Sequence, residues 1–286
     1  MMKQSKTYTL GLYEKAMPGE LSFPQKLELT ARCGFDRLEI SVDETEAKLA
    51  RLDYSPREMN EIAEASRNTG VPITTMCLSG HRKFPLGSSD CQIVRRSLEI
   101  MEKALNLSAA LGVRIIQLAG YDVYYEPSSS DTVRRFGDNL ARAVEMAASY
   151  GIILGFETME TPFMDTTAKA MAYVRQIDSP YLGVYPDIGN LKNAAVLYGS
   201  DVVEDLKTGN GHIFAAHMKE TRPGVYRDMT FGSGGHTEYT RCVRELWAQG
   251  VRMYTGEFWY KGGDTYEADI LAASRFLREK IDSIAG

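Results

Sequence analysis

Two kinds of apolar pattern alternate along the chain. Short runs rich in β-branched and aromatic residues predict eight strands, near residues 8–13, 37–42, 71–78, 113–119, 152–158, 182–187, 213–219 and 252–259. Longer stretches with apolar positions three and four residues apart predict a helix after each strand, near 22–34, 55–69, 90–111, 131–149, 165–178, 201–208, 236–249 and 266–283. The chain is therefore expected to fold as repeated strand-helix units.

The ends of the predicted helices support this division. Ser55-Pro56 and Asp165-Thr166 are typical of helix starts. Glycines follow several predicted helices, where a helix C-cap needs a positive φ, at Gly34, Gly70, Gly112, Gly151 and Gly250. No linker, low-complexity tract or tandem repeat interrupts the series. We predict one α/β domain over residues 1–286, a single (β/α)8 barrel.

Composition narrows the function classes. With 286 residues, 44% of them apolar, the chain has the size of one barrel enzyme, and its net charge of −5 argues against nucleic-acid binding. No uncharged apolar stretch reaches the roughly 18 residues of a membrane span. The four cysteines form no CxxC pair, and no charged-then-apolar leader opens the chain. We therefore expect a cytoplasmic protein with reduced thiols and a small substrate.

Four residues with metal-binding side chains end the last four predicted strands. They are Glu157, Asp187, His217 and Glu257, with separations of 30, 30 and 40 residues. Each separation accommodates one strand and one crossover helix, so parallel strands would bring the four side chains to one rim of the barrel. A single acid there is more often a helix cap or an ion-pair partner. Four together predict a site for one divalent metal.

Strand-end sequences also carry a family resemblance. The strings are Gly-Leu-Tyr-Glu-Lys-Ala (11–16), Glu-Ile-Ser-Val-Asp-Glu-Thr (39–45), Cys-Leu-Ser-Gly-His-Arg-Lys-Phe-Pro-Leu-Gly (77–87), Ile-Gln-Leu-Ala-Gly-Tyr-Asp-Val-Tyr-Tyr (116–125), Tyr-Pro-Asp-Ile-Gly-Asn (185–190) and His-Met-Lys-Glu-Thr-Arg-Pro-Gly (217–224). Together they resemble the L-ribulose-5-phosphate 3-epimerases, also called L-xylulose-5-phosphate 3-epimerases. That family belongs to the xylose-isomerase-like TIM barrels.

The resemblance implies an activity and roles for the four strand-end residues. The implied reaction interconverts L-ribulose 5-phosphate and L-xylulose 5-phosphate through an enediolate, by removing and returning a proton at C3. Glu157 and Glu257 would be both metal ligands and the acid/base pair, whereas Asp187 and His217 would only hold the metal. The family favours Mn²⁺, although the ligand types also suit Mg²⁺, Co²⁺ or Zn²⁺. The pathway, such as L-ascorbate degradation, stays open, and a homodimer is the default expectation.

Further residues are candidates for substrate contact. Tyr13 and Trp259 are expected to wall the sugar, and Asn190 and His81 lie in predicted strand-end loops. Phosphate is expected near the last two loops, where barrels often bind it through backbone N–H groups. The candidates there are the glycine run with Gly232, Ser233 and Gly234, and the cations Lys219 and Arg222.

Other functions remain open at this stage. A ketose/aldose isomerase, or a 3-epimerase of free ketoses, would use the same barrel and a similar metal site. A metal-dependent endonuclease is disfavoured because only four histidines occur and the charge is negative. A non-catalytic sugar-binding barrel is the most remote alternative.

Overall fold

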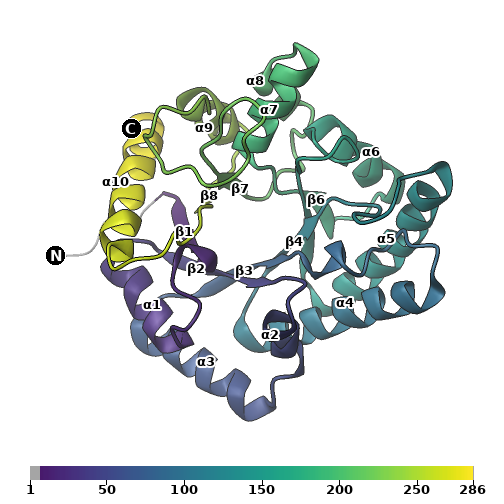
Figure 1. Ribbon diagram of the computed structural model, residues 1–286, viewed down its shortest axis with the longest axis horizontal. Coiled ribbons are helices and arrows are strands. Elements are labelled where there is room, and N and C mark those ends of the chain that lie inside the picture. Colours follow the sequence, from purple (N-terminus) through teal and green to yellow (C-terminus); the bar gives the residue numbers. More distant parts are fainter. Residues whose placement is uncertain (1–6, 286) are drawn as a thin grey trace.

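Every strand of the computed structural model is followed by at least one helix on the outside of the sheet (Figure 1), and the structure describes residues 7–285. The strands are β1 (Thr9–Tyr13), β2 (Arg37–Val42), β3 (Ile73–Leu78), β4 (Ile115–Ala119), β5 (Ile153–Glu157), β6 (Leu182–Val184), β7 (Ala216–Met218) and β8 (Met253–Gly256). The helices are α1 (Phe23–Arg32), α2 (Glu46–Leu49), α3 (Pro56–Thr69), α4 (Cys91–Leu111), α5 (Ser130–Tyr150), α6 (Thr167–Ile177), α7 (Ile188–Tyr198), α8 (Val202–Lys207), α9 (Tyr239–Ala248) and α10 (Tyr266–Ala285). Short 3₁₀ turns cover Glu14–Ala16, Ala50–Asp53 and Gly80–Arg82.

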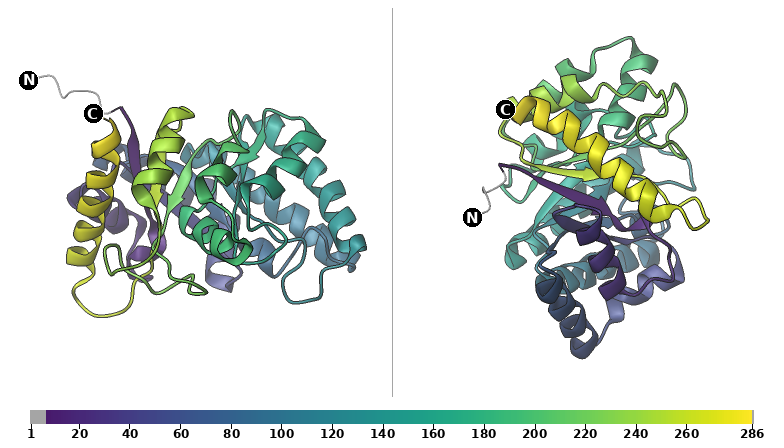
Figure 2. Two further views of the ribbon diagram at one scale, coloured as in Figure 1. Left: turned by 90° about the horizontal axis from the view of Figure 1, so that it is seen from above. Right: turned by 90° about the vertical axis from the view of Figure 1, so that its left-hand side faces the viewer.

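The sheet is parallel and closes on itself. Its order is β6-β5-β4-β3-β2-β1-β8-β7. Isolated parallel bridges between Val184 and Ile213 and between Asp187 and His217 join the two outer strands. Helix α10 completes the outer ring between α9 and α1 (Figures 1 and 2). The predicted (β/α)8 barrel is confirmed.

Alternation along the strands separates an apolar outside from a polar inside. In β2, Leu38 and Ile40 belong to the large apolar cluster formed with the helices. Arg37 and Glu39, which alternate with these two residues, are fully buried and point to the other side of the sheet, into the barrel. The main hydrophobic core therefore lies between the strands and the helices. The barrel interior holds the buried charges together with a small apolar cluster of Ile115, Tyr185 and Ala215.

Most of the predicted element ends agree with the structure. Ser55 caps α3 with a full capping box, and Thr166 caps α6. The five glycines predicted to end helices all have positive φ, from 65° to 86°. The predicted sixth, seventh and eighth strands were too long, since β6 ends at Val184, β7 covers only Ala216–Met218 and β8 only Met253–Gly256. After Asp187 the chain enters α7 directly. No helix within residues 7–285 combines the length and apolar character needed to cross a membrane.

The absence of a side chain at Gly183 is required for barrel closure. A Cβ atom at this position in β6 would lie 2.2 Å from Phe214 Cε2 and 2.5 Å from the His212 carbonyl oxygen. We predict that Gly183→Ala lowers the free energy of unfolding by about 1–3 kcal/mol, because the segment leading into β7 must move. Denaturant unfolding measures this change.

Gly19→Ala is the matched control, because no atom lies within 4 Å of a Cβ there. It should change stability by less than about 0.5 kcal/mol, as an ordinary surface substitution does. Equal stability of the two variants would contradict the close packing described at β6.

Candidate functional site

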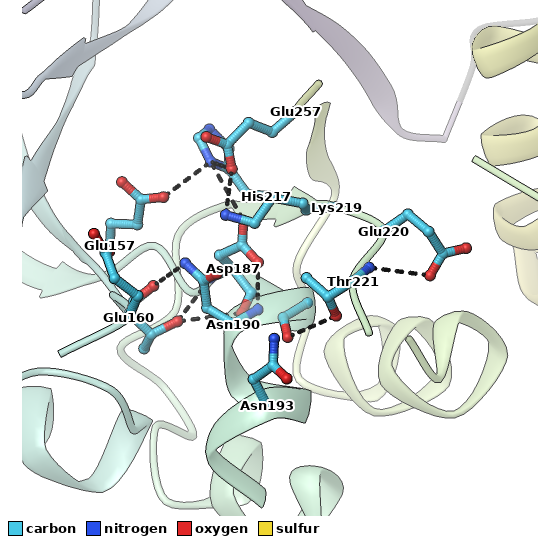
Figure 3. Close-up of polar contacts among 12 residues, drawn as sticks. Glu157, Glu160, Asp187, Asn190, Asn193, His217, Lys219, Glu220, Thr221 and Glu257 are labelled. Carbon is cyan, nitrogen blue, oxygen red and sulfur yellow. Dashed lines mark hydrogen bonds and ion pairs between the residues drawn. The ribbon is translucent and has the colours of Figure 1, made fainter. Parts of the chain in front are cut away.

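The four strand-end residues converge at the carboxyl rim of the barrel (Figure 3). Glu157 ends β5, Asp187 precedes α7, His217 lies in β7 and Glu257 follows β8. All four are buried, and one ligand atom from each lies within 4.8 Å of the others. The sequence spacing therefore predicted this convergence correctly.

His217 lies among the three acids. Its Nδ1 atom is 3.2 Å from Glu257 Oε2, 3.6 Å from Glu157 Oε1 and 4.0 Å from Asp187 Oδ2. Lys219, two residues later on the same face of the chain, places its Nζ atom 3.0 Å from Asp187 Oδ2 and 3.1 Å from Glu257 Oε2. One ammonium group is thus shared by two of the acids.

Asp187 has two separate tasks. Its Oδ1 accepts a 2.8 Å hydrogen bond from the Asn190 backbone N–H and caps α7, and its own N–H donates to Thr158 Oγ1. Its buried Oδ2 accepts no hydrogen bond from the described residues and is approached by the Lys219 ammonium and the His217 imidazole. The cap fixes the carboxylate, while its second oxygen is available to a cation.

The charges of the barrel interior fit a divalent cation. Four buried carboxylates, on Glu39, Glu157, Asp187 and Glu257, accompany two permanent cations, Arg37 and Lys219. The acids outnumber the permanent cations by two. Burial alone would lower the pKa of His217, but Glu39 and Glu257 raise it well above its usual value, as an excess of acids around the imidazole would. Carboxylate oxygens with one imidazole suit Mn²⁺, Mg²⁺, Co²⁺ or Zn²⁺. The residues present therefore fit the predicted metal.

The two glutamates of the cluster have pKa values shifted in opposite directions. Burial and the neighbouring Glu257 raise the pKa of Glu157. Burial alone would also raise the pKa of Glu257, but Lys219 and then His217 outweigh it and hold that pKa well below its usual range. Burial raises the pKa of Asp187 despite Lys219. Carboxyls with separated pKa values are suited to act as an acid and a base.

A cavity opens over the cluster, and several predicted contact residues line it. Tyr13, Asn190, Lys219 and Trp259 are among the lining residues, with the rings of Tyr13 and Trp259 in an edge-on contact at 6.2 Å. The other lining residues are Lys15, Cys77, Ser79, Arg82, Glu157, Met159, Glu160, Tyr226, Arg227 and Glu257.

Other predicted contact residues lie elsewhere. His81 is buried, its Nε2 lies 3.1 Å from the Ser97 carbonyl oxygen, and burial lowers its pKa to about 4, so it packs as a neutral core residue. Arg222 is exposed and donates to the Ser233 carbonyl. Neither residue lines the cavity, and Gly232, Ser233 and Gly234 are absent from its lining as well. The structure thus gives no support to direct substrate contact by these five residues.

The sequence prediction missed the residues beneath the cluster and some at the cavity mouth. Glu39 contacts His217 from the side of the barrel interior away from the cavity. Arg37 lies two residues earlier on the same face of β2, further from the cluster. The signal was present in Arg-Leu-Glu-Ile-Ser-Val (37–42), where polar residues, two of them charged, occupy every second position of a buried strand. Lys15 and Arg227 carried no comparable signal, because single loop cations are common.

Comparison with known proteins identifies sequence relatives along almost the full length. A family model described as the xylose isomerase-like TIM barrel matches residues 27–280. The chain is 40% identical over 278 residues to the L-ribulose-5-phosphate 3-epimerase UlaE of Escherichia coli (strain SMS-3-5 / SECEC), covering 97% of this chain and 96% of the relative. It is also 40% identical over 280 residues to UlaE of Salmonella typhimurium (strain LT2), covering 98% and 97%.

Solved structures share the architecture at lower identity. D-psicose 3-epimerase from Clostridium cellulolyticum H10, crystallised with D-tagatose, superposes with a TM-score of 0.80 at 16% identity and covers 96% of this chain and 99% of its own. An L-ribulose 3-epimerase gives a TM-score of 0.75 at 18% identity, covering 97% and 95%. At these identities the likeness establishes a common fold.

The separation of the two tasks of Asp187 allows a test of metal binding. Asp187→Asn keeps Oδ1 as the cap of α7 but removes the negative charge that faces the cluster. We predict an unchanged fold by circular dichroism. The affinity for Mn²⁺, measured by calorimetry, should fall by more than the roughly 10- to 100-fold typical of losing an outer partner.

Asp201→Asn is the matched control, because Asp201 caps α8 in the same way but lies on the surface, paired with Arg241. It should bind Mn²⁺ as the unaltered protein does. Full Mn²⁺ affinity in Asp187→Asn would remove Asp187 from the metal site.

Proposed function

The chain belongs to the xylose isomerase-like TIM barrel family and is a sugar 3-epimerase within it, and we propose that it interconverts L-ribulose 5-phosphate and L-xylulose 5-phosphate. The choice of substrate is supported by relatives named for L-ribulose 5-phosphate that match 97% of the chain. The observation that carries the chemistry is the convergence of Glu157, Asp187, His217 and Glu257 beside one cavity, with one ligand atom from each within 4.8 Å of the others.

In this proposal Glu157, Asp187, His217 and Glu257 hold one divalent ion, with Mn²⁺ favoured. When bound, the ion supplies positive charge that stabilises the negative oxygen developing on the sugar. Lys219, shared between Asp187 and Glu257, adds a second positive charge to the same region. Tyr13, Trp259 and Asn190 line the space left for the sugar.

Glu157 and Glu257 would move the protons. Glu257, held ionised by Lys219, takes the proton from C3, the electron pair of that bond enters the C2–C3 bond, and negative charge moves onto the C2 oxygen. Glu157, whose raised pKa favours the protonated form, returns a proton to the opposite face of C3. The roles exchange in the reverse direction. An inverted C3 centre is the net result.

The cellular setting follows the sequence expectations. We propose a cytoplasmic homodimer that acts in L-sugar catabolism such as L-ascorbate degradation. A ketose/aldose isomerase remains the second candidate, because it would use the same cluster with proton transfer between C1 and C2.

Deuterium incorporation tests the reaction and both glutamates together. L-Ribulose 5-phosphate is incubated in D₂O with Mn²⁺-loaded protein, the metal is removed, and NMR follows deuterium at each carbon. We predict deuterium at C3 together with L-xylulose 5-phosphate. Glu157→Gln and Glu257→Gln should each lose epimerisation by roughly 10²- to 10⁴-fold, the usual worth of general acid/base catalysis.

The two variants serve as controls for each other. With metal content matched, each should still exchange the C3 proton of one epimer, and the two should differ in which epimer this is. Deuterium at C1 would replace the proposal with an isomerase. A variant that epimerises normally would remove its glutamate from proton transfer.

The phosphate group requires cations that carboxylates do not already neutralise. Lys15 is paired with Asp43 at 2.6 Å, and Lys219 is held by the metal-cluster acids. Arg82 is paired with Glu44 at 3.9 Å and lies over the rings of Tyr121 and Tyr124. Arg227 lines the same cavity beside the Trp259 ring, is exposed, and has no ion-pair partner among residues 7–285. We therefore propose Arg227 as the principal phosphate contact.

Arg227→Gln and Arg222→Gln separate this proposal from the sequence-based assignment. Loss of a charge-assisted contact of about 1.5–3 kcal/mol should raise the KM for the sugar phosphate roughly 10- to 150-fold in Arg227→Gln. The activity on free L-ribulose should not change. If Arg222→Gln carries the effect instead, the phosphate lies at the glycine run.

A further inference from the structure

Glu39 lies inside the barrel directly beneath the metal cluster. It belongs to β2, is fully buried, and places Oε1 2.6 Å from His217 Nε2. Its other oxygen, Oε2, accepts a 2.8 Å hydrogen bond from the Tyr185 hydroxyl, which extends from the segment after β6. The Glu39 carboxylate therefore connects β2 to His217 in β7 and to Tyr185 after β6, across the interior of the barrel.

The two nitrogens of His217 face different partners. Nδ1 faces the cluster, 3.2 Å from Glu257 and 3.6 Å from Glu157, whereas Nε2 faces Glu39. A metal binds an imidazole nitrogen through its lone pair, so that nitrogen must carry no proton. The contact of Nε2 with Glu39, at 2.6 Å, is shorter than the 3.2 Å contact of Nδ1 with Glu257, which favours the ring proton on Nε2 and leaves the lone pair of Nδ1 facing the cluster. The hydrogen bond thus selects the tautomer that a metal requires.

A further neighbour, Gln117, does not make this selection. Its Nε2 atom lies 3.0 Å from Nδ1 and 3.1 Å from Nε2 of His217, so it favours neither nitrogen. Its Oε1 atom has no hydrogen-bond partner among the described residues. Glu39 is the group that distinguishes the two ring nitrogens.

Contacts on both oxygens hold Glu39 in place. His217 Nε2 lies 2.6 Å from Oε1, and the Tyr185 hydroxyl donates to Oε2. Arg37 is itself fixed by hydrogen bonds to Thr75 Oγ1 and Thr255 Oγ1. Gly11 leaves room for this guanidinium, since a Cβ there would lie 2.7 Å from it. The lower barrel layer therefore holds both Arg37 and Glu39 in fixed positions.

We propose that Glu39 is a positioning residue of the metal site, which fixes the tautomer and ring orientation of His217 and so raises the affinity for a divalent cation. Carboxylates that hold metal-binding histidines in this way commonly contribute 10- to 100-fold to metal affinity. The inference rests on the proposed metal site but not on the identity of the sugar.

Calorimetric titration of the metal-free protein with Mn²⁺, without substrate, tests the inference. Glu39→Gln keeps the shape and one acceptor oxygen but removes the charge, and it should bind Mn²⁺ about 10- to 100-fold more weakly. Tyr185→Phe keeps the Glu39 charge and removes only its hydrogen-bond donor. It should weaken binding by less, about 3-fold. Circular dichroism and the Tm of each variant check that the fold is intact.

Proton NMR of the Zn²⁺-loaded protein gives an independent reading. In the short bond to a carboxylate, the His217 Nε2 proton should resonate far downfield, and Glu39→Gln should move it upfield. A folded Glu39→Gln variant with unaltered Mn²⁺ affinity would overturn the inference. If Glu39→Gln does not fold, Tyr185→Phe decides the question. The inference would be overturned if this variant left both the Mn²⁺ affinity and the chemical shift of the His217 Nε2 proton unchanged.

The test of Glu39 and the test of the proposed substrate can fail independently of each other. Weakened Mn²⁺ binding in Glu39→Gln, in a protein that epimerises no pentulose phosphate, would support Glu39 and reject the substrate. Normal epimerisation with unaltered Mn²⁺ affinity in Glu39→Gln would support the substrate and reject the role of Glu39.

Discussion

Charge balance inside the barrel is the constraint on which the rest of the structure depends. An ionised group without water must be paired with an opposite charge or bound by hydrogen bonds, because its desolvation otherwise costs several kcal/mol. Here Glu39 faces His217, with Arg37 as a further positive neighbour, and Glu257 and Asp187 share Lys219. The remaining deficit lies at the rim, where the pKa values of Glu157 and Asp187 are raised. The protein therefore concentrates its unbalanced negative charge where a cation can enter from the cavity.

This constraint also explains where the hydrophobic core lies. Inside the barrel, a small apolar cluster of Ile115, Tyr185 and Ala215 lies beside the charged and polar side chains, and it is too small to supply the main apolar burial. Outward positions such as Leu38, Ile40 and Phe156 supply it by packing against the helices. Small residues then make room for long polar ones, as Gly11 does for Arg37. Stability comes mainly from the outer layer, and the inner layer is left to chemistry.

Strand order and the strand-end residues could be predicted from the sequence, because both depend on local patterns and on regular spacing. Glu157, Asp187, His217 and Glu257 each follow an apolar run, and parallel strands bring such positions together whatever lies between them. The helix after Asp187 was missed because its Gly189 and Asn190 are typical of a loop, whereas the Asp187 cap and tertiary packing favour α7. Burial of His81 against Ser97 and the solvent-facing Arg222 depend on how loops fold back over helices, which spacing does not encode. The Glu39 contact joins residues 178 positions apart and needed the closed barrel to be seen.

The interior residues beneath the cluster and the acids at the rim have different roles, one structural and one in proton transfer. The lower layer of Arg37, Glu39 and Tyr185 is buried and held by hydrogen bonds across the barrel, so it can hold His217 without taking part in the reaction. The rim layer must change its protonation during each turnover, which requires that Glu157 and Glu257 not be locked by permanent partners of equal strength. Lys219 favours Glu257 over Glu157, since it lies 3.1 Å from the former and makes no ion pair with the latter within 4.0 Å. That asymmetry at the rim is what separates the pKa values of two otherwise identical carboxyl groups.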